Sequence, residues 1–147
     1  MKFKHGTRRR AAEYEKDWVQ RWKDDDTFNK SIAQRPADNS WVFYDGPPFL
    51  TGTPHHGHLL VSTVKDTMGR FHTMKGQRVE RRWGWDCHGL PAEVYVEKTL
   101  GISNKKEIGT KISVSDYVKE CRAAMVRTGT EWEDTIERIG RWVEFKG

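Results

Sequence analysis

Hydrophobic positions recur at helical spacing near both ends of the chain. Between Arg8 and Phe28, apolar residues three or four positions apart are separated by acidic and basic residues; they are Ala11, Tyr14, Trp18 and Trp22. This pattern predicts an amphipathic helix. The same spacing returns from Ser115 to Val143 and predicts a long amphipathic helix, with Gly129 as the point where it could break. Both ends of the chain are therefore expected to be helical.

The middle of the chain combines short aromatic or β-branched runs with a third helical pattern. Residues 41–44 (WVFY) precede a Gly/Pro turn and predict a buried strand. A helix is expected from Gly57 to about Lys75, where Gly76 supplies the C-cap, and the weak alternation of residues 77–83 predicts a second strand. A helix that connects two parallel strands forms a βαβ unit.

Loops and one further helix complete the pattern. Residues 29–40, which contain Pro36, and residues 101–113 are expected to be loops. Pro91 suits the first turn of another helix, because its missing N–H costs nothing there. Parallel sheets are normally covered on both faces and flanked by further strands, and the chain offers few candidates for such neighbours. We therefore expect an α/β fold that amounts to only part of an open sheet.

The composition is that of one polar domain. The chain has 147 residues, of which 35% are hydrophobic and 32% charged, so it can form a small core. Its seven Trp residues argue against a disordered tail. The formal net charge is +5, and the clearest basic cluster is Lys2, Lys4 and Arg8–Arg10. This cluster fits a mild attraction to phosphate-rich partners, and it fits an ordinary solvated surface equally well.

The two cysteines and the hydropathy indicate a cytoplasmic protein. Cys87 and Cys121 form neither a disulfide framework nor a C-x-x-C metal pair, so a reducing compartment is the default. No apolar run approaches the length of a membrane span or resembles a signal peptide. Acidic residues at positions 13, 15 and 17 argue against a transit peptide. We expect no membrane partner.

The stretch DGPPFLTGTPHHGHLL, residues 45–60, is the first candidate site. A Gly/Pro loop delivers three histidines, His55, His56 and His58, to the start of a helix, where free N–H groups and partial positive charge attract phosphate. Ligands of open α/β sheets also bind at the carboxyl ends of the strands. Gly57 has no Cβ, so a flat ring or a sugar could approach its backbone closely. The pattern favours a nucleoside triphosphate, whose phosphate oxygens would accept hydrogen bonds from the imidazoles.

Two other interpretations of the histidines stay open. His55, His56, His58, Cys87 and His88 are all zinc ligands by type. The histidines lack the i, i+4 spacing of helical zinc pairs, however, and no C-x-x-C partner exists, so we predict no metal site. The histidines could also cap the helix without binding any ligand.

The stretch WGWDCHGLPAE, residues 83–93, begins where the second predicted strand ends. Carboxyl ends of neighbouring parallel strands face the same crevice, so this stretch should lie beside the histidine loop. Asp86, in a turn bounded by Gly84 and Gly89, could hold a cation such as an amino-acid ammonium. The alternative is that Asp86 only caps the following turn. Its place at a strand end favours the binding role.

These motifs together resemble one enzyme family. The segment His55–His58 resembles the H-x-G-H motif of class I aminoacyl-tRNA synthetases, a motif that nucleotidylyltransferases also carry. Combined with Asp45–Pro48 upstream and Gly84–Pro91 downstream, it is similar to isoleucyl-tRNA synthetases. Residues 43–49 with Thr51-Gly52 resemble the branch found in eukaryotes, archaea and some bacteria. The resemblance runs from about Tyr14 to the C-terminus.

The resemblance implies a fold and a division of the chain. The fold would be an incomplete Rossmann-like, class I synthetase fold, with one βαβ unit, an N-terminal helix and a long C-terminal helix. Residues 1–40 would form the N-terminal helix and linker, and residues 41–147 the first part of the catalytic domain.

The resemblance also implies an activity, which is ATP-dependent formation of isoleucyl-adenylate and transfer of isoleucine to tRNA-Ile. ATP would be a substrate together with Mg²⁺, and no zinc would be bound. His55 and His58 would be catalytic and contact the ATP phosphates. The ATP site as a whole would comprise Pro48, Phe49, Gly52, Thr53, His55, Gly57 and His58.

The amino-acid site is implied in the same way. Asp86 would bind the ammonium group of isoleucine, and Pro47 would form one wall of the side-chain pocket. Gly84, Trp85 and His88 would complete this site.

The chain departs from the family in what it lacks. These 147 residues contain no lysine-bearing K-M-S-K-S-type loop, editing insertion or anticodon-binding helices, and Lys105-Lys106 and Lys111 do not match that loop. We therefore expect an N-terminal fragment, monomeric and weakly active or inactive by itself. Two alternatives stay open: a small H-x-G-H nucleotidylyltransferase, and a non-catalytic module that binds a nucleotide or RNA.

Overall fold

A computed structural model describes residues 6, 8–49 and 52–145. Lys2, Lys4 and Thr51 lie outside these residues, as do the side chains of residues 125–130. The helices are α1 (Ala11–Asp24), α2 (Thr27–Ala33), the 3₁₀ turn η1 (Ala37–Asn39), α3 (His56–Met74), α4 (Leu90–Leu100), the 3₁₀ turn η2 (Lys105–Glu107) and α5 (Val114–Arg138).

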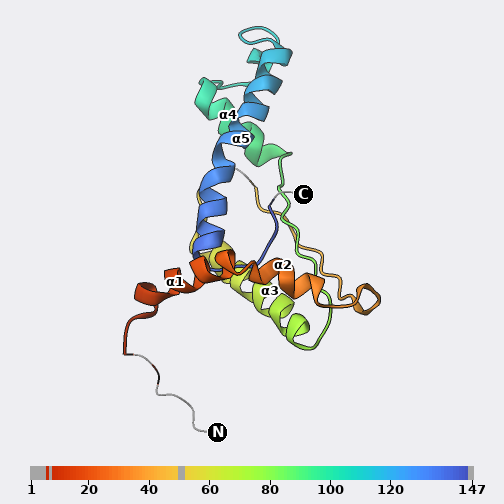
Figure 1. Cartoon of the computed structure of the whole chain (residues 1–147). Coiled ribbons are helices and arrows are strands. Elements are labelled where there is room, and N and C mark those ends of the chain that lie inside the picture. The colour runs from red at the N-terminus through yellow and green to blue at the C-terminus, as the bar shows by residue number, and fades with distance from the viewer. Residues whose placement is uncertain (1–5, 7, 50–51, 146–147) are drawn as a thin grey trace.

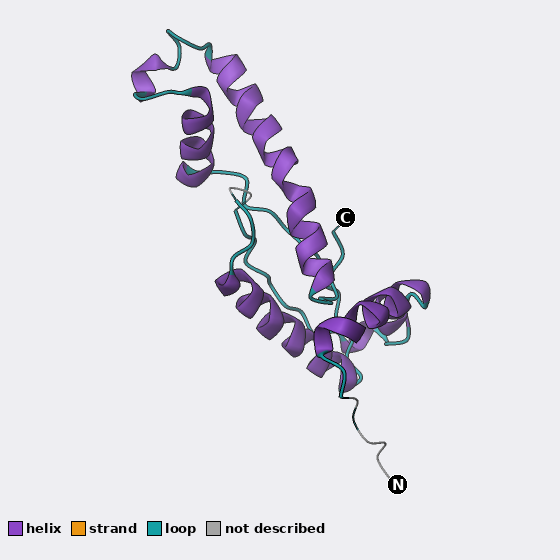
Figure 2. Ribbon diagram, turned by 90° about the vertical axis from the view of Figure 1, so that its left-hand side faces the viewer, coloured by secondary structure: helices purple, strands orange, loops and turns teal. Residues whose placement is uncertain are grey.

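The helices form two groups. Helices α4 and α5 run antiparallel and project from the rest of the chain, with η2 near their far end (Figure 1). The other end of α5 meets α1, where Arg138 pairs with Glu15 at 2.7 Å. Helix α3 lies below the α4–α5 pair in Figure 2, beside the extended segments that precede and follow it in sequence. No helix of the described part is both long and apolar enough to cross a bilayer.

The predicted N-terminal helix is wrong as a single element. Helix α1 ends at Asp24 and α2 begins at Thr27, because Asp26 adopts a left-handed conformation with φ 49°. Aspartate is a weak helix former and tolerates this conformation better than most residues. The acidic run therefore bends the chain between α1 and α2.

The other three predicted helices are confirmed. Helix α3 ends next to Gly76, whose φ is 88°, and Pro91 lies in the first turn of α4. Helix α5 runs through Gly129 without a break but ends before Val143, because Gly140 takes a φ of 72°. The Ser113 side chain caps its start by accepting the backbone N–H of Asp116 at 3.0 Å.

The two predicted strands are not confirmed. Within the described residues there are only isolated parallel bridges, which join Ser40 to Arg78 and Phe49 to Asp86. Two further bridges join Arg82 to Glu144 and Ile108 to Ile112. Parallel pairing is stable chiefly where both faces of the sheet are covered, whereas Val42 and Tyr44 are 68% and 92% exposed. The extended segments nonetheless run parallel, with α3 between them in sequence.

The main core lies between α4, α5 and the segment that precedes α4. Ala92 and Val96 of α4 face buried residues of α5. Trp132 and Ile136, near the end of α5, are 2% and 0% exposed. Trp83 and Trp85 pack edge-on or tilted against Trp132. Trp132 thus links the helical core to the loops of the candidate site.

Candidate active site

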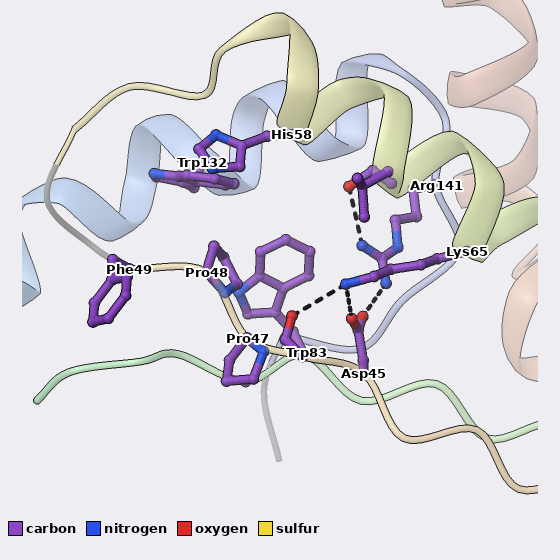
Figure 3. Close-up of a pocket in the computed structure, with 13 residues that line it drawn as sticks. Asp45, Pro47, Pro48, Phe49, His58, Lys65, Trp83, Trp132 and Arg141 are labelled. Carbon is purple, nitrogen blue, oxygen red and sulfur yellow. Dashed lines mark hydrogen bonds and ion pairs between the residues drawn. The ribbon is translucent and has the colours of Figure 1, made fainter.

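A cavity of about 290 Å³ opens between the loop after Tyr44, the first turns of α3 and the extended segment at Trp83. Figure 3 shows His58 and Trp132 along one side of it and Pro47 and Pro48 along another. Its lining comprises Asp45, Gly46, Pro47, Pro48, Phe49, His58, Val61, Ser62, Lys65, Trp83, Gly84, Trp132 and Arg141.

The two motif histidines form a stacked pair at the start of α3. Their ring centroids are 3.6 Å apart, at an interplanar angle of 22°. His55 is the N-cap residue, and its Nδ1 accepts the Gly57 backbone N–H at 3.1 Å. His58 Nδ1 accepts the backbone N–H of His55 at 3.3 Å. The two side chains therefore cap the helix reciprocally, in the manner of a capping box.

This capping determines which ring nitrogens carry protons. A backbone N–H can only donate, so Nδ1 of both His55 and His58 must act as an acceptor. The proton of each neutral ring is then on Nε2. His55 and His58 therefore do cap the helix, and each ring keeps an Nε2–H that is not used in the capping.

The protonation of His58 is disfavoured by its surroundings. Burial lowers its pKa below the ordinary value of about 6.5, and the nearby His55 lowers it further. One neighbour that buries the ring is Trp132, whose ring centroid lies 4.8 Å from that of His58. A protonated His58 would also lose the Nδ1 acceptor that caps the helix.

The lowered pKa predicts a loss of stability in mild acid. Because the folded-state pKa of His58 lies below its unfolded value, its contribution is fully present above about pH 6.5 and is lost as the pH falls through the folded-state pKa. The midpoint of thermal unfolding should therefore decline below pH 6.5, and less so in His58→Gln. The exposed His56 gives the matched control, His56→Gln. A parallel pH dependence in wild type and His58→Gln would contradict this assignment.

Asp45, Lys65 and Arg141 form a charged network that the sequence interpretation missed. The Asp45 carboxylate accepts from Lys65 Nζ and from Arg141 (Figure 3). Arg141 also donates to Ser62 Oγ at 3.1 Å. Local spacing in the sequence could have linked only Ser62 with Lys65, which are three positions apart on α3. Arg141 lies 96 positions from Asp45, so no local pattern indicates that these two residues pair.

The Pro47–Phe49 loop and the Asp86 turn lie next to each other, as predicted from the two strand ends. The Asp86 backbone N–H donates to the Pro48 carbonyl at 2.9 Å. The Asp86 carboxylate, however, accepts the backbone N–H of His88 at 3.3 Å, which is the turn-capping alternative. It does not line the cavity, so its binding role stays a prediction.

Of the remaining predicted site residues, only some lie at the cavity. Gly84 lines the cavity, whereas Trp85 packs into the aromatic core and His88 is exposed. The Gly52 carbonyl accepts the Trp132 indole N–H at 2.7 Å, and Thr53 is exposed. A Cβ on Gly57 would lie 3.0 Å from the His55 ring, so the missing side chain makes room for that histidine.

A family profile described as tRNA synthetases class I (I, L, M and V) matches residues 17–147. The chain belongs to the class I tRNA synthetases. The match extends over nearly all of the described residues, including both loops of the cavity and the whole of α5.

Individual members of this family that the chain resembles are isoleucine–tRNA ligases. The chain is 47% identical to the isoleucine–tRNA ligase of Treponema denticola over 135 residues, which cover 92% of the chain and 12% of that protein. It is 48% identical to the cytoplasmic isoleucine–tRNA ligase of Caenorhabditis elegans over 87% of the chain and 11% of the relative. Isoleucine–tRNA ligase 2 of Pseudomonas fluorescens is 46% identical over 88% of the chain and 12% of the relative. The chain spans about 12% of the length of these proteins.

Proposed function

We propose that this chain supplies part of the active site of an isoleucine–tRNA ligase. The observation that carries the proposal is the stacked His55–His58 pair, of which His58 lines a cavity shared with the Pro47–Phe49 loop. Its relatives at 46–48% identity are named isoleucine–tRNA ligases. The complete protein would activate isoleucine with ATP, transfer it to tRNA-Ile, and act as a cytoplasmic monomer.

We also propose the Rossmann-like βαβ arrangement for the fold. The parallel bridges at residues 40–78 and 49–86, with α3 between them in sequence, support it. Residues 1–40 would then be an N-terminal helical element and linker, and residues 41–147 the first part of the catalytic domain. Further strands packed on residues 41–49 and 78–86 would turn the isolated bridges into a sheet.

The first chemical step would be attack of the isoleucine carboxylate on the ATP α-phosphorus. A P–O bond forms to the carboxylate, the bond to the bridging oxygen breaks, and pyrophosphate leaves. Nε2–H groups of His55 and His58 would donate to phosphate oxygens on which negative charge builds up, with the α3 N-terminus close by. No covalent enzyme intermediate is needed, so positioning and electrostatic stabilisation dominate.

The two substrates would divide the cavity between them. Pro48, Phe49, Gly52, Thr53 and Gly57 would contact ATP together with the histidines. Pro47, Gly84, Trp85 and His88 would surround isoleucine, with Asp86 receiving its ammonium group. A rotation of the Asp86 side chain away from its own turn would free the carboxylate for that contact, at the loss of one hydrogen bond.

Mg²⁺ would accompany ATP rather than occupy a cage in this chain. Across residues 6, 8–49 and 52–145, no three or more His, Cys, Asp and Glu side chains are grouped so that they could hold a metal ion. The residues present do not fit a dedicated site, and we assign Mg²⁺ no ligand here. ATP can carry the ion on its own phosphate oxygens, as it does in many nucleotide sites.

Calorimetric titration of the chain tests the proposal. We expect a non-hydrolysable isoleucyl-adenylate analogue to bind more tightly than the leucyl analogue or ATP alone, because Pro47 and Gly84 would form a side-chain pocket. Equal binding of the two analogues would favour a nucleotidylyltransferase. Binding of RNA alone would favour a non-catalytic module.

A further inference from the structure

Asp45 connects three parts of the chain that are distant in sequence. Its carboxylate lies between Lys65 of α3 and Arg141 of the segment after α5 (Figure 3). The exposed fractions of these side chains are 15% for Asp45, 22% for Lys65 and 7% for Arg141. The Arg141 guanidinium also lies 5.0 Å from the centroid of the Trp83 ring. The carboxylate is therefore mostly shielded from water, with a cation on either side.

The loop that follows Asp45 has few means of attachment of its own. Pro47 and Pro48 have no backbone N–H, so they cannot donate hydrogen bonds that would hold them in place. The loop is held instead through carbonyl oxygens. Lys65 Nζ donates to the Gly46 carbonyl at 3.1 Å, and the Asp86 N–H donates to the Pro48 carbonyl at 2.9 Å.

Lys65 therefore contacts both the Asp45 carboxylate and the adjoining carbonyl. It extends from α3 two turns after His58, so the same helix that carries the histidine also fixes the start of the proline loop. The two sides of the cavity are joined by this one side chain and by Arg141. A shift of Asp45 would move Pro47 and Phe49 relative to His58.

We propose that Asp45 is a positioning residue of the candidate active site. It acts through Lys65 and Arg141 to set the distance between the proline loop and the histidines, and it does not itself contact a substrate. Neutralising it would leave two cations facing each other in a poorly solvated place, and their repulsion would separate α3 from the loop. This inference rests on the function proposed for the cavity.

Asp66, the residue after Lys65 on α3, provides a matched control for Asp45. Its side chain is 14% exposed, and its carboxylate pairs with Arg70 at 2.6 Å and accepts the Trp142 backbone N–H at 3.1 Å. Like Asp45, it holds the segment after α5 against α3. Unlike Asp45, which begins the proline loop and lines the cavity, Asp66 lies on α3 and does not line the cavity. Asp45→Asn and Asp66→Asn thus remove equally buried charges that differ in their connection to the cavity.

The test measures loop position and ligand binding separately in the intact chain. Amide hydrogen exchange at Asp86 reports the loop directly, because that N–H bonds to Pro48. We expect Asp45→Asn to exchange faster at Asp86 and to bind the isoleucyl-adenylate analogue on the order of 10- to 100-fold more weakly. Asp66→Asn should lose thermal stability but keep the wild-type exchange rate at Asp86 and the wild-type affinity.

Several outcomes would overturn the inference. If both variants lost affinity in proportion to their loss of stability, the network would be only structural. Unchanged exchange at Asp86 in Asp45→Asn would have the same meaning. If Asp45→Asn does not fold, Lys65→Met serves as a second variant, because it retains the Asp45–Arg141 pair. Amide exchange at Asp86 must then be faster in Lys65→Met than in the wild type. If the wild type bound no analogue, the proposed function would fail, while the exchange comparison would still decide the role of Asp45.

Discussion

In a full-length isoleucine–tRNA ligase related to this chain, His58→Ala should slow isoleucyl-adenylate formation by on the order of 10²–10³-fold. The reason is that one preorganised donor to a developing phosphate charge is lost, and such donors are worth about this much. Nδ1 of His58 already accepts the His55 N–H, so Nε2–H is the donor that a phosphate would lose, along with the loss of the cap. Isoleucine-dependent exchange of pyrophosphate into ATP measures this step.

The matched control is His56→Ala. His56 is exposed and does not line the cavity, so its removal should leave the exchange rate nearly unchanged. His58→Gln tests whether capping alone matters, because Gln at the N3 position can accept the N-cap backbone N–H in a capping box but carries no imidazole Nε2–H. A His58→Ala enzyme with the wild-type exchange rate would reject the catalytic role of His58.

Local sequence was sufficient for the parts of the fold that depend on nearby residues. The start of α4 at Pro91 and the end of α3 beside Gly76 follow from the backbone preferences of those two residues. The split between α1 and α2 was missed because the helical spacing of Ala11 to Trp22 was extended to Phe28, although no apolar residue lies between Trp22 and Phe28. Periodicity reports which residues share a face, and it does not report a left-handed residue such as Asp26.

The strands illustrate a dependence on distant parts of the chain. Residues 41–44 have the composition of a buried strand, yet Val42 and Tyr44 are exposed and only the bridges at residues 40 and 49 form. A parallel strand is stabilised by neighbours and by layers on both faces. Whether such a segment becomes a strand therefore depends on packing partners that its own sequence does not encode.

In the candidate site, too, contacts between nearby residues could be predicted and contacts between distant residues could not. The placement of His55 and His58 together at the start of α3 could be predicted because they are only three positions apart, whereas the stacking of their rings was not predicted. The Asp45–Arg141 and Trp132–Gly52 contacts bridge 96 and 80 positions, and nothing in local spacing marks either pair. The candidate histidines could thus be found from a motif, whereas the residues that hold them and the neighbouring loops in place could not.

Replacing Trp132 with alanine should remove much of the stability of the chain. The side chain is 2% exposed and packs against His58, Trp83 and Trp85. Removing a buried Trp side chain costs about 3–5 kcal/mol, which is a large share of the about 5–15 kcal/mol that stabilises a typical domain. We expect a clearly lower midpoint of urea unfolding, measured by far-ultraviolet circular dichroism, or no folded chain at all.

Two further variants separate the contributions of Trp132. Trp132→Phe keeps an aromatic ring but loses the indole N–H donated to the Gly52 carbonyl at 2.7 Å, so it should cost only about 1 kcal/mol plus any packing defect. Trp18→Ala, at a position that is 48% exposed, should change the free energy of unfolding by about 0.5 kcal/mol. Equal urea midpoints for Trp132→Ala and Trp18→Ala would show that Trp132 does not join the core to the site. The Asp45 network and the hydrogen bond from the Asp86 N–H to the Pro48 carbonyl would then be what holds the loops of the candidate site.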